Sequence, residues 1–170
     1  MFTEVIRQQQ IAIIEVLARE IWTEHYTPII GRDQVEYMLG TFQSKDAISA
    51  QIETEGYRYF LMEEKGAHIG YMAVQPMGDE LFLSKIYIKA SQREKWLGKK
   101  AIRFLENLAS GLHLRIISLT VNKNNIHSIK AYEKMGFKNL GPVVQDIGNG
   151  FIMDDFKMEK IVSYSAGNGN

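Results

Sequence analysis

The chain contains no cysteine among its 170 residues. This absence excludes a disulfide scaffold, a thiolate zinc site and a cysteine nucleophile. Long hydrophobic runs are missing as well, because no stretch approaches the 18 consecutive apolar residues of a membrane-spanning helix. The first residues lack the basic region and apolar run of a secretory signal. We therefore expect a cytoplasmic protein without a membrane partner.

Neither sign of charge is in excess, since 20 Lys and Arg residues balance 20 Asp and Glu residues. This balance argues against a protein that binds nucleic acid nonspecifically. The four histidines show no ligand spacing and no H-E-x-x-H motif, so we expect no metal site. With 45% hydrophobic residues, the composition is that of an ordinary globular protein. We expect a single domain over residues 1–162, and a flexible polar tail over residues 163–170.

Hydrophobic periodicity predicts the order of the elements. Three helices come first, then three strands, then a helix, a strand, a helix and two strands. Pro28 and Gly31 are expected to end the first helix, and Ser44 to cap the third. This order predicts an α/β fold of the α+β type, a mixed sheet with flanking helices. The expected helices span about 8–26, 35–42, 45–56, 96–110 and 125–135, and the expected strands about 2–7, 57–62, 68–74, 81–88, 115–121, 137–145 and 151–160, with turns at 76–79 and 147–150.

A short loop at residues 89–95 joins a strand to a helix, and this junction is a candidate anion site. The amide groups of a helix N-terminus, together with the helix dipole, favour phosphate or pyrophosphate. Gly98 would allow close approach of the backbone. The alternative is a plain strand–helix junction with solvated lysines. Neither a Walker P-loop nor a Rossmann G-x-G-x-x-G motif is present. The nearby basic residues are Arg93, Lys95, Lys99 and Lys100.

A second polar segment leaves the strand at 115–121 and enters the next helix. Asn125, Ser128 and Tyr132 lie on one face of that helix, because residues three and four apart stack. Polar groups at a strand end beside a helix start commonly line a ligand crevice. The alternative is that Asn125 only caps the helix and Tyr132 packs in the core.

Together, these two segments resemble the GNAT superfamily of acyl-CoA-dependent N-acetyltransferases over about residues 57–160. The family's pyrophosphate loop, Q/R-x-x-G-x-G/A, is matched at Arg93 and Gly98, whereas Trp96 stands where the family usually has Gly. The downstream pattern N-x-x-A/S-x-x-x-Y-x-x-x-G-F is met in full. It is carried by Asn125, Ser128, Tyr132, Gly136 and Phe137.

The resemblance implies a mixed, mostly antiparallel sheet whose two central parallel strands splay apart, with acetyl-CoA in the slot between them. It implies that Asn125 and Ser128 lie near the pantetheine arm and that Tyr132 is the general acid beside the thioester sulfur. The backbone of Ile86, Tyr87 and Ile88 would pair with the pantetheine amides, and the loop of Arg93, Glu94, Lys95, Trp96, Leu97, Gly98 and Lys99 would hold the pyrophosphate.

The acceptor is expected to be a primary amine, in particular a small cationic amine such as a polyamine. The segment at 146–155 resembles polyamine and related small-amine acetyltransferases, although Asp154 and Asp155 also read as a solvated turn. Acidic residues in the N-terminal helices, Glu20, Glu24 and Asp33, also favour a cation. The candidates for the general base, by chemistry alone, are Glu24, Glu80 and His68.

Two alternatives differ from this reading. One is protein or peptide N-acetylation, which needs an open groove, whereas a small amine allows closure by the N-terminal helices. The other is a non-catalytic acyl-CoA-binding module, which the Trp96 departure favours and the presence of Tyr132 disfavours. A homodimer is expected from the family and from the apolar content of the last strands.

Overall fold

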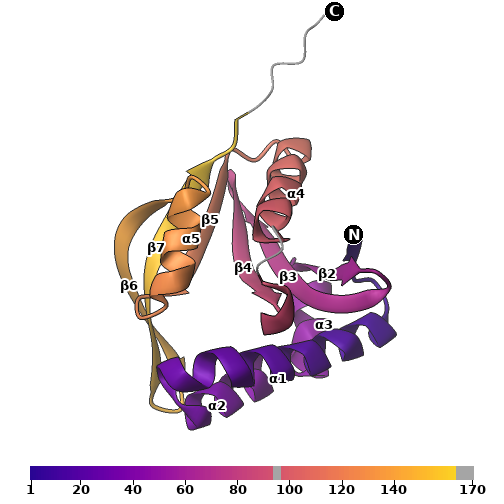
Figure 1. The fold of residues 1–170 in the computed structure, drawn as a ribbon, viewed down its shortest axis with the longest axis vertical. Coiled ribbons are helices and arrows are strands. Elements are labelled where there is room, and N and C mark those ends of the chain that lie inside the picture. Colours follow the sequence, from indigo (N-terminus) through magenta and orange to yellow (C-terminus); the bar gives the residue numbers. More distant parts are fainter. Residues whose placement is uncertain (94–96, 164–170) are drawn as a thin grey trace, which may run out of the picture.

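A computed structural model describes residues 1–93 and 97–163 of the chain (Figure 1). The N-terminal third forms a short strand followed by helices, and the remainder forms most of the sheet with its covering helices. The elements are β1 (Phe2–Glu4), α1 (Gln8–Ile30), α2 (Arg32–Phe42), α3 (Lys45–Thr54), β2 (Arg58–Glu64), β3 (Ala67–Met77), β4 (Glu80–Ile88), the 3-10 turn η1 (Ala90–Gln92), α4 (Leu97–Gly111), β5 (Ile116–Asn122), α5 (Ile126–Lys134), β6 (Lys138–Gly148) and β7 (Phe151–Ile161).

The strands form one seven-stranded sheet in the order β1-β2-β3-β4-β5-β7-β6. Neighbouring strands are antiparallel except for the central pair, β4 and β5, which is parallel. The predicted fold class, a mixed and mostly antiparallel sheet with flanking helices, is therefore confirmed.

The central parallel strands pair over only part of their length. Their register runs from Glu80 opposite Ile116 to Leu83 opposite Leu119 and then stops, although β4 continues to Ile88. In Figure 1 the two strands diverge toward α1. The predicted splayed pair is present, and the separation begins at Ser84.

A β-bulge lies at this same point. Val74 of β3 pairs with Leu83, but Ala73 pairs with Lys85, so Ser84 is an extra residue in β4. A bulge reverses the faces of the residues that follow it. Leu83 packs in the core beside α4, whereas Tyr87, four residues later, packs against the core beside α1. The bulge therefore turns Lys85 and Tyr87 toward the N-terminal helices.

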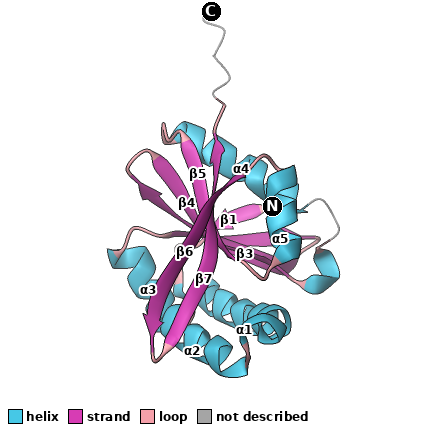
Figure 2. Cartoon of the chain, turned by 90° about the vertical axis from the view of Figure 1, so that its left-hand side faces the viewer, coloured by secondary structure: helices cyan, strands magenta, loops and turns pink. Residues whose placement is uncertain are grey.

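Helices cover both faces of the sheet (Figure 2). One hydrophobic core, with Leu105 and Ile117 fully buried, lies beneath α4 and α5. The other, with Ile14 and Tyr71 fully buried, lies beneath α1, α2 and α3. Within the described residues, no helix is long and apolar enough to cross a membrane.

Two prolines lie where the sequence predicted breaks. Helix α1 continues through Pro28 to Ile30, rather than ending near residue 26. Pro28 and Glu24 are exposed, so water can replace the hydrogen bond that proline cannot donate. Pro76 lies inside β3 and not in a turn. Beyond Val74, β3 still pairs with β4 but no longer with β2. The backbone N–H that proline lacks is therefore not needed on that unpaired side.

Candidate active site

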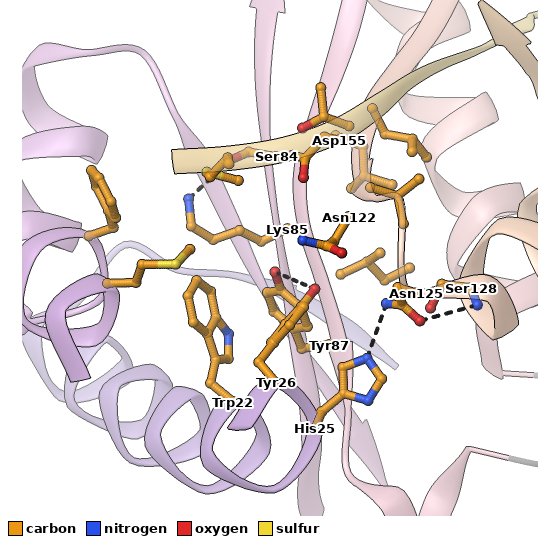
Figure 3. A pocket seen from close by; sticks show the side chains of 18 of the residues that line it. Trp22, His25, Tyr26, Ser84, Lys85, Tyr87, Asn122, Asn125, Ser128 and Asp155 are labelled. Atoms are coloured by element: carbon orange, nitrogen blue, oxygen red, sulfur yellow. Dashed lines mark hydrogen bonds between the residues drawn. The ribbon is translucent and has the colours of Figure 1, made fainter. Parts of the chain in front are cut away.

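A cavity of about 540 Å³ opens where β4 and β5 separate. Its walls come from the second half of β4, the end of β5, the start of α5 and the N-terminal helices (Figure 3). It therefore joins segments that are far apart in the sequence.

Most of the site residues predicted from the sequence share this cavity. Leu97 is instead buried in the core, and Lys99 lines a second cavity between α4 and the end of α5. Glu94, Lys95 and Trp96 lie outside the described residues, so the structure does not test their part in the loop. The predicted residues that line the main cavity are Ile86, Tyr87, Ile88, Arg93, Gly98, Asn125, Ser128 and Tyr132.

Asn125 both caps α5 and faces the cavity. Its side-chain oxygen accepts a hydrogen bond from the Ser128 backbone N–H at 3.4 Å, as an N-cap residue does. The side chain is buried, and its amide nitrogen lies 3.1 Å from Nε2 of His25. The two readings of Asn125 from the sequence, cap and cavity residue, are thus compatible.

His25 connects the two arms of the slot, a role that sequence reasoning missed. Its Nδ1 lies 3.4 Å from the Arg93 guanidinium, which also donates to the Ile88 carbonyl at 3.0 Å. Its Nε2 faces Asn125 on the opposite arm. Burial and the positive charge of Arg93 lower the pKa of His25. The neutral imidazole lies between the two arms and has one acceptor nitrogen, so it can accept a hydrogen bond from Arg93 or from Asn125 but not from both at once.

Gly98 stands at the start of α4 beside open space. A Cβ built on it would meet no atom of the described residues within 4 Å outside its own helix. The N-terminus of α4 thus leaves room for a ligand to approach the backbone. The neighbouring second cavity is lined mainly by cationic side chains, namely Lys99, Lys100, Arg103, Lys134 and Lys160, together with Ile102, Glu106 and Met135.

Tyr132 lines the main cavity from α5. Burial, with a smaller contribution from Tyr26, raises the pKa of Tyr132 above its ordinary value. The phenol therefore keeps its proton at neutral pH and can act as a proton donor. Across the cavity, Tyr26 and Tyr87 are joined by a 3.4 Å hydrogen bond, and Trp22 packs edge-on against both rings.

The structure corrects the reading of Asp154 and Asp155 as a solvated turn. Both lie within β7, and Asp155 is buried opposite Asn122 and lines the cavity (Figure 3). Burial raises the pKa of Asp155 to about 6, although a hydrogen bond from Thr120 opposes this. Asp154 points away and pairs with Lys123 at 2.5 Å. The alternation of a strand separates the two neighbours.

Lys85 was also missed, because in the sequence it is one polar residue in an apolar strand. It is the only buried lysine among the described residues, and it lines the cavity next to Ser84. Burial lowers the pKa of Lys85 to about 8, with the negative charge of Glu55 opposing.

None of the base candidates from the sequence lines the cavity. Glu80 forms an ion pair with Lys157, His68 contacts Glu63, and Glu24 is exposed. In the described part of the chain, no group of three or more acidic or histidine residues could hold a metal ion. Asp155 is the buried carboxylate that lines the cavity, which makes it a candidate base.

The N-terminal helices close one side of the cavity against the β6–β7 hairpin. The Tyr37 hydroxyl of α2 donates to the Ile147 carbonyl at 2.8 Å, and Gln34 donates to the Ile152 carbonyl at 2.9 Å. The ring of Tyr37 also lies 5.4 Å from that of Phe151. Figure 2 shows the tip of the hairpin reaching α2.

A family model of the acetyltransferase (GNAT) family matches residues 17–137. The chain belongs to the GNAT family of acetyltransferases. The family and the fold expected from the two motifs are thus confirmed. The expected activity, that of an acyl-CoA-dependent N-acetyltransferase with acetyl-CoA as cosubstrate, is confirmed with them.

Solved structures of other GNAT proteins share this fold. A PaiA N-acetyltransferase from Thermoplasma acidophilum, in complex with coenzyme A, is 20% identical with a TM-score of 0.76, covering 95% of this chain and 99% of that one. A ribosomal-protein-alanine N-acetyltransferase from Brucella melitensis is 17% identical with a TM-score of 0.70, covering 95% and 99%. A chimera of the spermidine N-acetyltransferase SpeG from Vibrio cholerae and hSSAT is 19% identical with a TM-score of 0.69, covering 95% and 94%. No curated protein matches this GNAT chain.

Proposed function

We propose that the protein transfers the acetyl group of acetyl-CoA to the primary amine of a small cationic molecule. One observation carries this proposal. A single cavity joins the motif residues Asn125, Ser128 and Tyr132 on one side to the buried carboxylate of Asp155 on another. Such a cavity can hold a thioester and an amine together next to a proton donor and a proton acceptor.

The splayed end of β4 is the proposed site for the pantetheine arm. Beyond Leu83, β4 no longer pairs with β5, so an extended ligand can add to its free edge through Ile86, Tyr87 and Ile88. The amides at the start of α4, beside Gly98, would hold the pyrophosphate. Asn125 and Ser128 would contact the pantetheine from the opposite arm.

The chemistry needs one proton acceptor and one proton donor. The ammonium first loses a proton to Asp155, and the neutral nitrogen then attacks the thioester carbonyl. The new N–C bond forms, the C–S bond breaks, and the nitrogen releases its second proton to water. The sulfur leaves as a thiol after taking a proton from Tyr132, which is reprotonated from solvent. The products are an N-acetyl amine and free coenzyme A.

A cationic acceptor is supported by Asp155 rather than by the wider set of acidic residues that suggested a polyamine. Glu20 pairs with Lys89, and the Asp146 carboxylate accepts from the Gly148 amide within its own turn. Among the acidic residues from which the sequence predicted a cationic acceptor, Asp155 alone lines the cavity. A polyamine stays a candidate acceptor, and the name of the SpeG chimera makes spermidine the first one to test.

Closure of the cavity favours a small acceptor over a peptide. The hydrogen bonds of Tyr37 and Gln34 to the β6–β7 hairpin join α2 to the hairpin along one wall of the cavity, which leaves less room for a peptide on that side. A purely acyl-CoA-binding role does not account for a partly buried phenol and a buried carboxylate in the same cavity.

A homodimer through β6 completes the proposal. This strand ends the sheet, and its partner β7 lies on one side only. Exposed apolar side chains lie on this hairpin, namely Leu140, Val143, Val144 and Ile152. An exposed edge strand presents unpaired backbone groups that can pair with a strand of another chain.

The test is acetyl-CoA turnover against a panel of amines, measured by free thiol release and by the mass of the product. We expect small primary amines to be acetylated and peptide N-termini to be inert. Turnover of peptides alone would overturn the acceptor class. Acetyl-CoA binding in calorimetry, without turnover of any amine, would support the non-catalytic alternative.

A further inference from the structure

Lys85 occupies an unusual place for a lysine. The bulge at Ser84 turns its side chain from the core beneath α4 to the cavity on the opposite face. There its amino group lies 5.2 Å from the ring centre of Tyr57 and 5.7 Å from that of Tyr59. The side chain is 9% exposed.

No carboxylate among the described residues forms an ion pair with this ammonium, although the exposed Glu55 lines the same cavity and its negative charge acts on Lys85. The ammonium donates a hydrogen bond to the Ser84 hydroxyl at 2.9 Å. An ammonium has three donor protons, so this arrangement leaves hydrogen-bonding capacity toward the cavity. Burial of a charge without an anionic partner is costly, and a packing role would be met at lower cost by an apolar side chain.

The position of Lys85 relates it to the acceptor rather than to acetyl-CoA. The motif residues Arg93 and Asn125 lie together at one end of the cavity, with His25 between them, whereas Lys85 lies beside Tyr57 and the end of α3. Asp155 lies on β7, on another wall. The cavity therefore presents one buried acid and one buried base to its contents.

We propose that Lys85 binds a carboxylate of the acceptor, so that the substrate is a small amino carboxylate. Asp155 receives the amine of this molecule, and Lys85, with the Ser84 hydroxyl beside it, receives the carboxylate. A single lysine and a hydroxyl match a monoanion. This inference rests on the proposed acetyl transfer. It narrows the acceptor from a cation in general to a molecule whose ammonium is accompanied by a carboxylate, so it replaces the polyamine as the expected acceptor.

The experiment compares matched acceptors under saturating acetyl-CoA. Glycine, β-alanine, 4-aminobutanoate and 5-aminopentanoate are each paired with the alkylamine that lacks the carboxylate, and putrescine and spermidine complete the set. We expect the best amino carboxylate to exceed its alkylamine in kcat/KM by roughly 10- to 100-fold, as for one hydrogen bond between charged groups.

Lys85→Met keeps the length of the side chain and removes its charge. We expect this variant to lose the preference for the amino carboxylate through a higher KM, with alkylamine turnover nearly unchanged. Lys45→Met, at an exposed lysine of α3 outside the cavity, is the matched control and should keep the preference. Circular dichroism and a melting curve establish that each variant is folded, and Lys85→Gln serves in its place if Lys85→Met is not.

Three results would overturn the inference. One is a wild-type preference for putrescine, spermidine or plain alkylamines, which leaves the proposed acetyl transfer intact. Another is an equal loss for every amine in Lys85→Met, which would make Lys85 a general base or a structural residue. The third is an unchanged preference in that variant. Failure of every amine with the wild-type enzyme would instead contradict the proposed function itself.

Discussion

Asp155 is a buried strand residue, although its neighbours in the sequence suggest an exposed turn. Burial raises the pKa of its carboxyl to about 6, so it is mostly ionised at pH 7 and mostly protonated at pH 5. If it receives the amine and its proton, kcat/KM should fall as the pH drops through about 6. The measurement is the pH profile of kcat/KM, and in Asp155→Asn the step near pH 6 should be absent.

Asp155→Asn should lower the activity without lowering the thermal stability. The folded pKa lies above the ordinary carboxyl value, so the stabilising contribution of this group is full below pH 4 and is lost as the pH rises through 6. At pH 7 the amide should therefore unfold at the same or a higher temperature. Activity should fall by about 10²–10⁴-fold, as when a general base is lost. A variant with lower stability and unchanged kcat/KM would contradict both parts.

The sequence could identify the site residues that belong to a local pattern. Asn125, Ser128 and Tyr132 share a face of one helix, and helical spacing is enough to place them together. Asp155 and Lys85 could not be placed this way, because their orientation depends on strand pairing. A one-residue change of register sends a strand residue to the other face of the sheet.

The strand pair β3–β4 carries a close approach that only glycine allows. A Cβ on Gly70 would lie 2.3 Å from the Tyr87 carbonyl oxygen, and Gly70 pairs with Ile88 at the edge of the slot. Gly70→Ala should therefore destabilise the protein by about 1–3 kcal/mol or more. Activity should fall as well, because the displaced backbone is the proposed pantetheine edge.

Gly40→Ala is the matched control for this substitution. Gly40 lies in α2, its Cβ would meet nothing within 4 Å among the described residues, and helical alanine is favoured over glycine. We expect a gain of about 0.5–1 kcal/mol. Thermal unfolding of both variants is the measurement, and equal melting temperatures would contradict the close contact at Gly70.

At the level of elements, the sequence predicted the order of helices and strands because each has clear periodicity. Ser44 was recognised as an N-cap, and its hydroxyl does accept from the Ala47 amide. The bulge at Ser84 could not be predicted, because a bulge is a property of two paired strands. Pro28 and Pro76 misled the prediction, since their tolerance depends on solvent and on a missing neighbouring strand.

At the level of the whole molecule, β6 gives a test of the proposed dimer. Val144 is 62% exposed on this edge strand. Light scattering at micromolar concentration should give about 39 kDa, twice the 19.5 kDa of one chain. Val144→Lys places a charge on the edge and should shift the mass toward 19.5 kDa. A wild-type mass of 19.5 kDa would refute the dimer.

The architecture brings the two halves of the chain together around one phenol. The motif helix α5 supplies Tyr132, the splayed β4 supplies the proposed edge for acetyl-CoA, and the N-terminal helices line the proposed acceptor side. The central claim is that acetyl transfer takes place in this cavity with Tyr132 as the acid.

Tyr132→Phe tests this claim most directly, because the substitution keeps the ring and its contact with Phe137 and removes only the hydroxyl. The measurement is kcat, with the acetyl-CoA affinity determined separately by calorimetry. The account predicts a fall in kcat of about 10²–10⁴-fold with the affinity nearly unchanged, since the lost interaction acts in the transition state. A variant that keeps kcat within about twofold while chemistry limits the rate would contradict it.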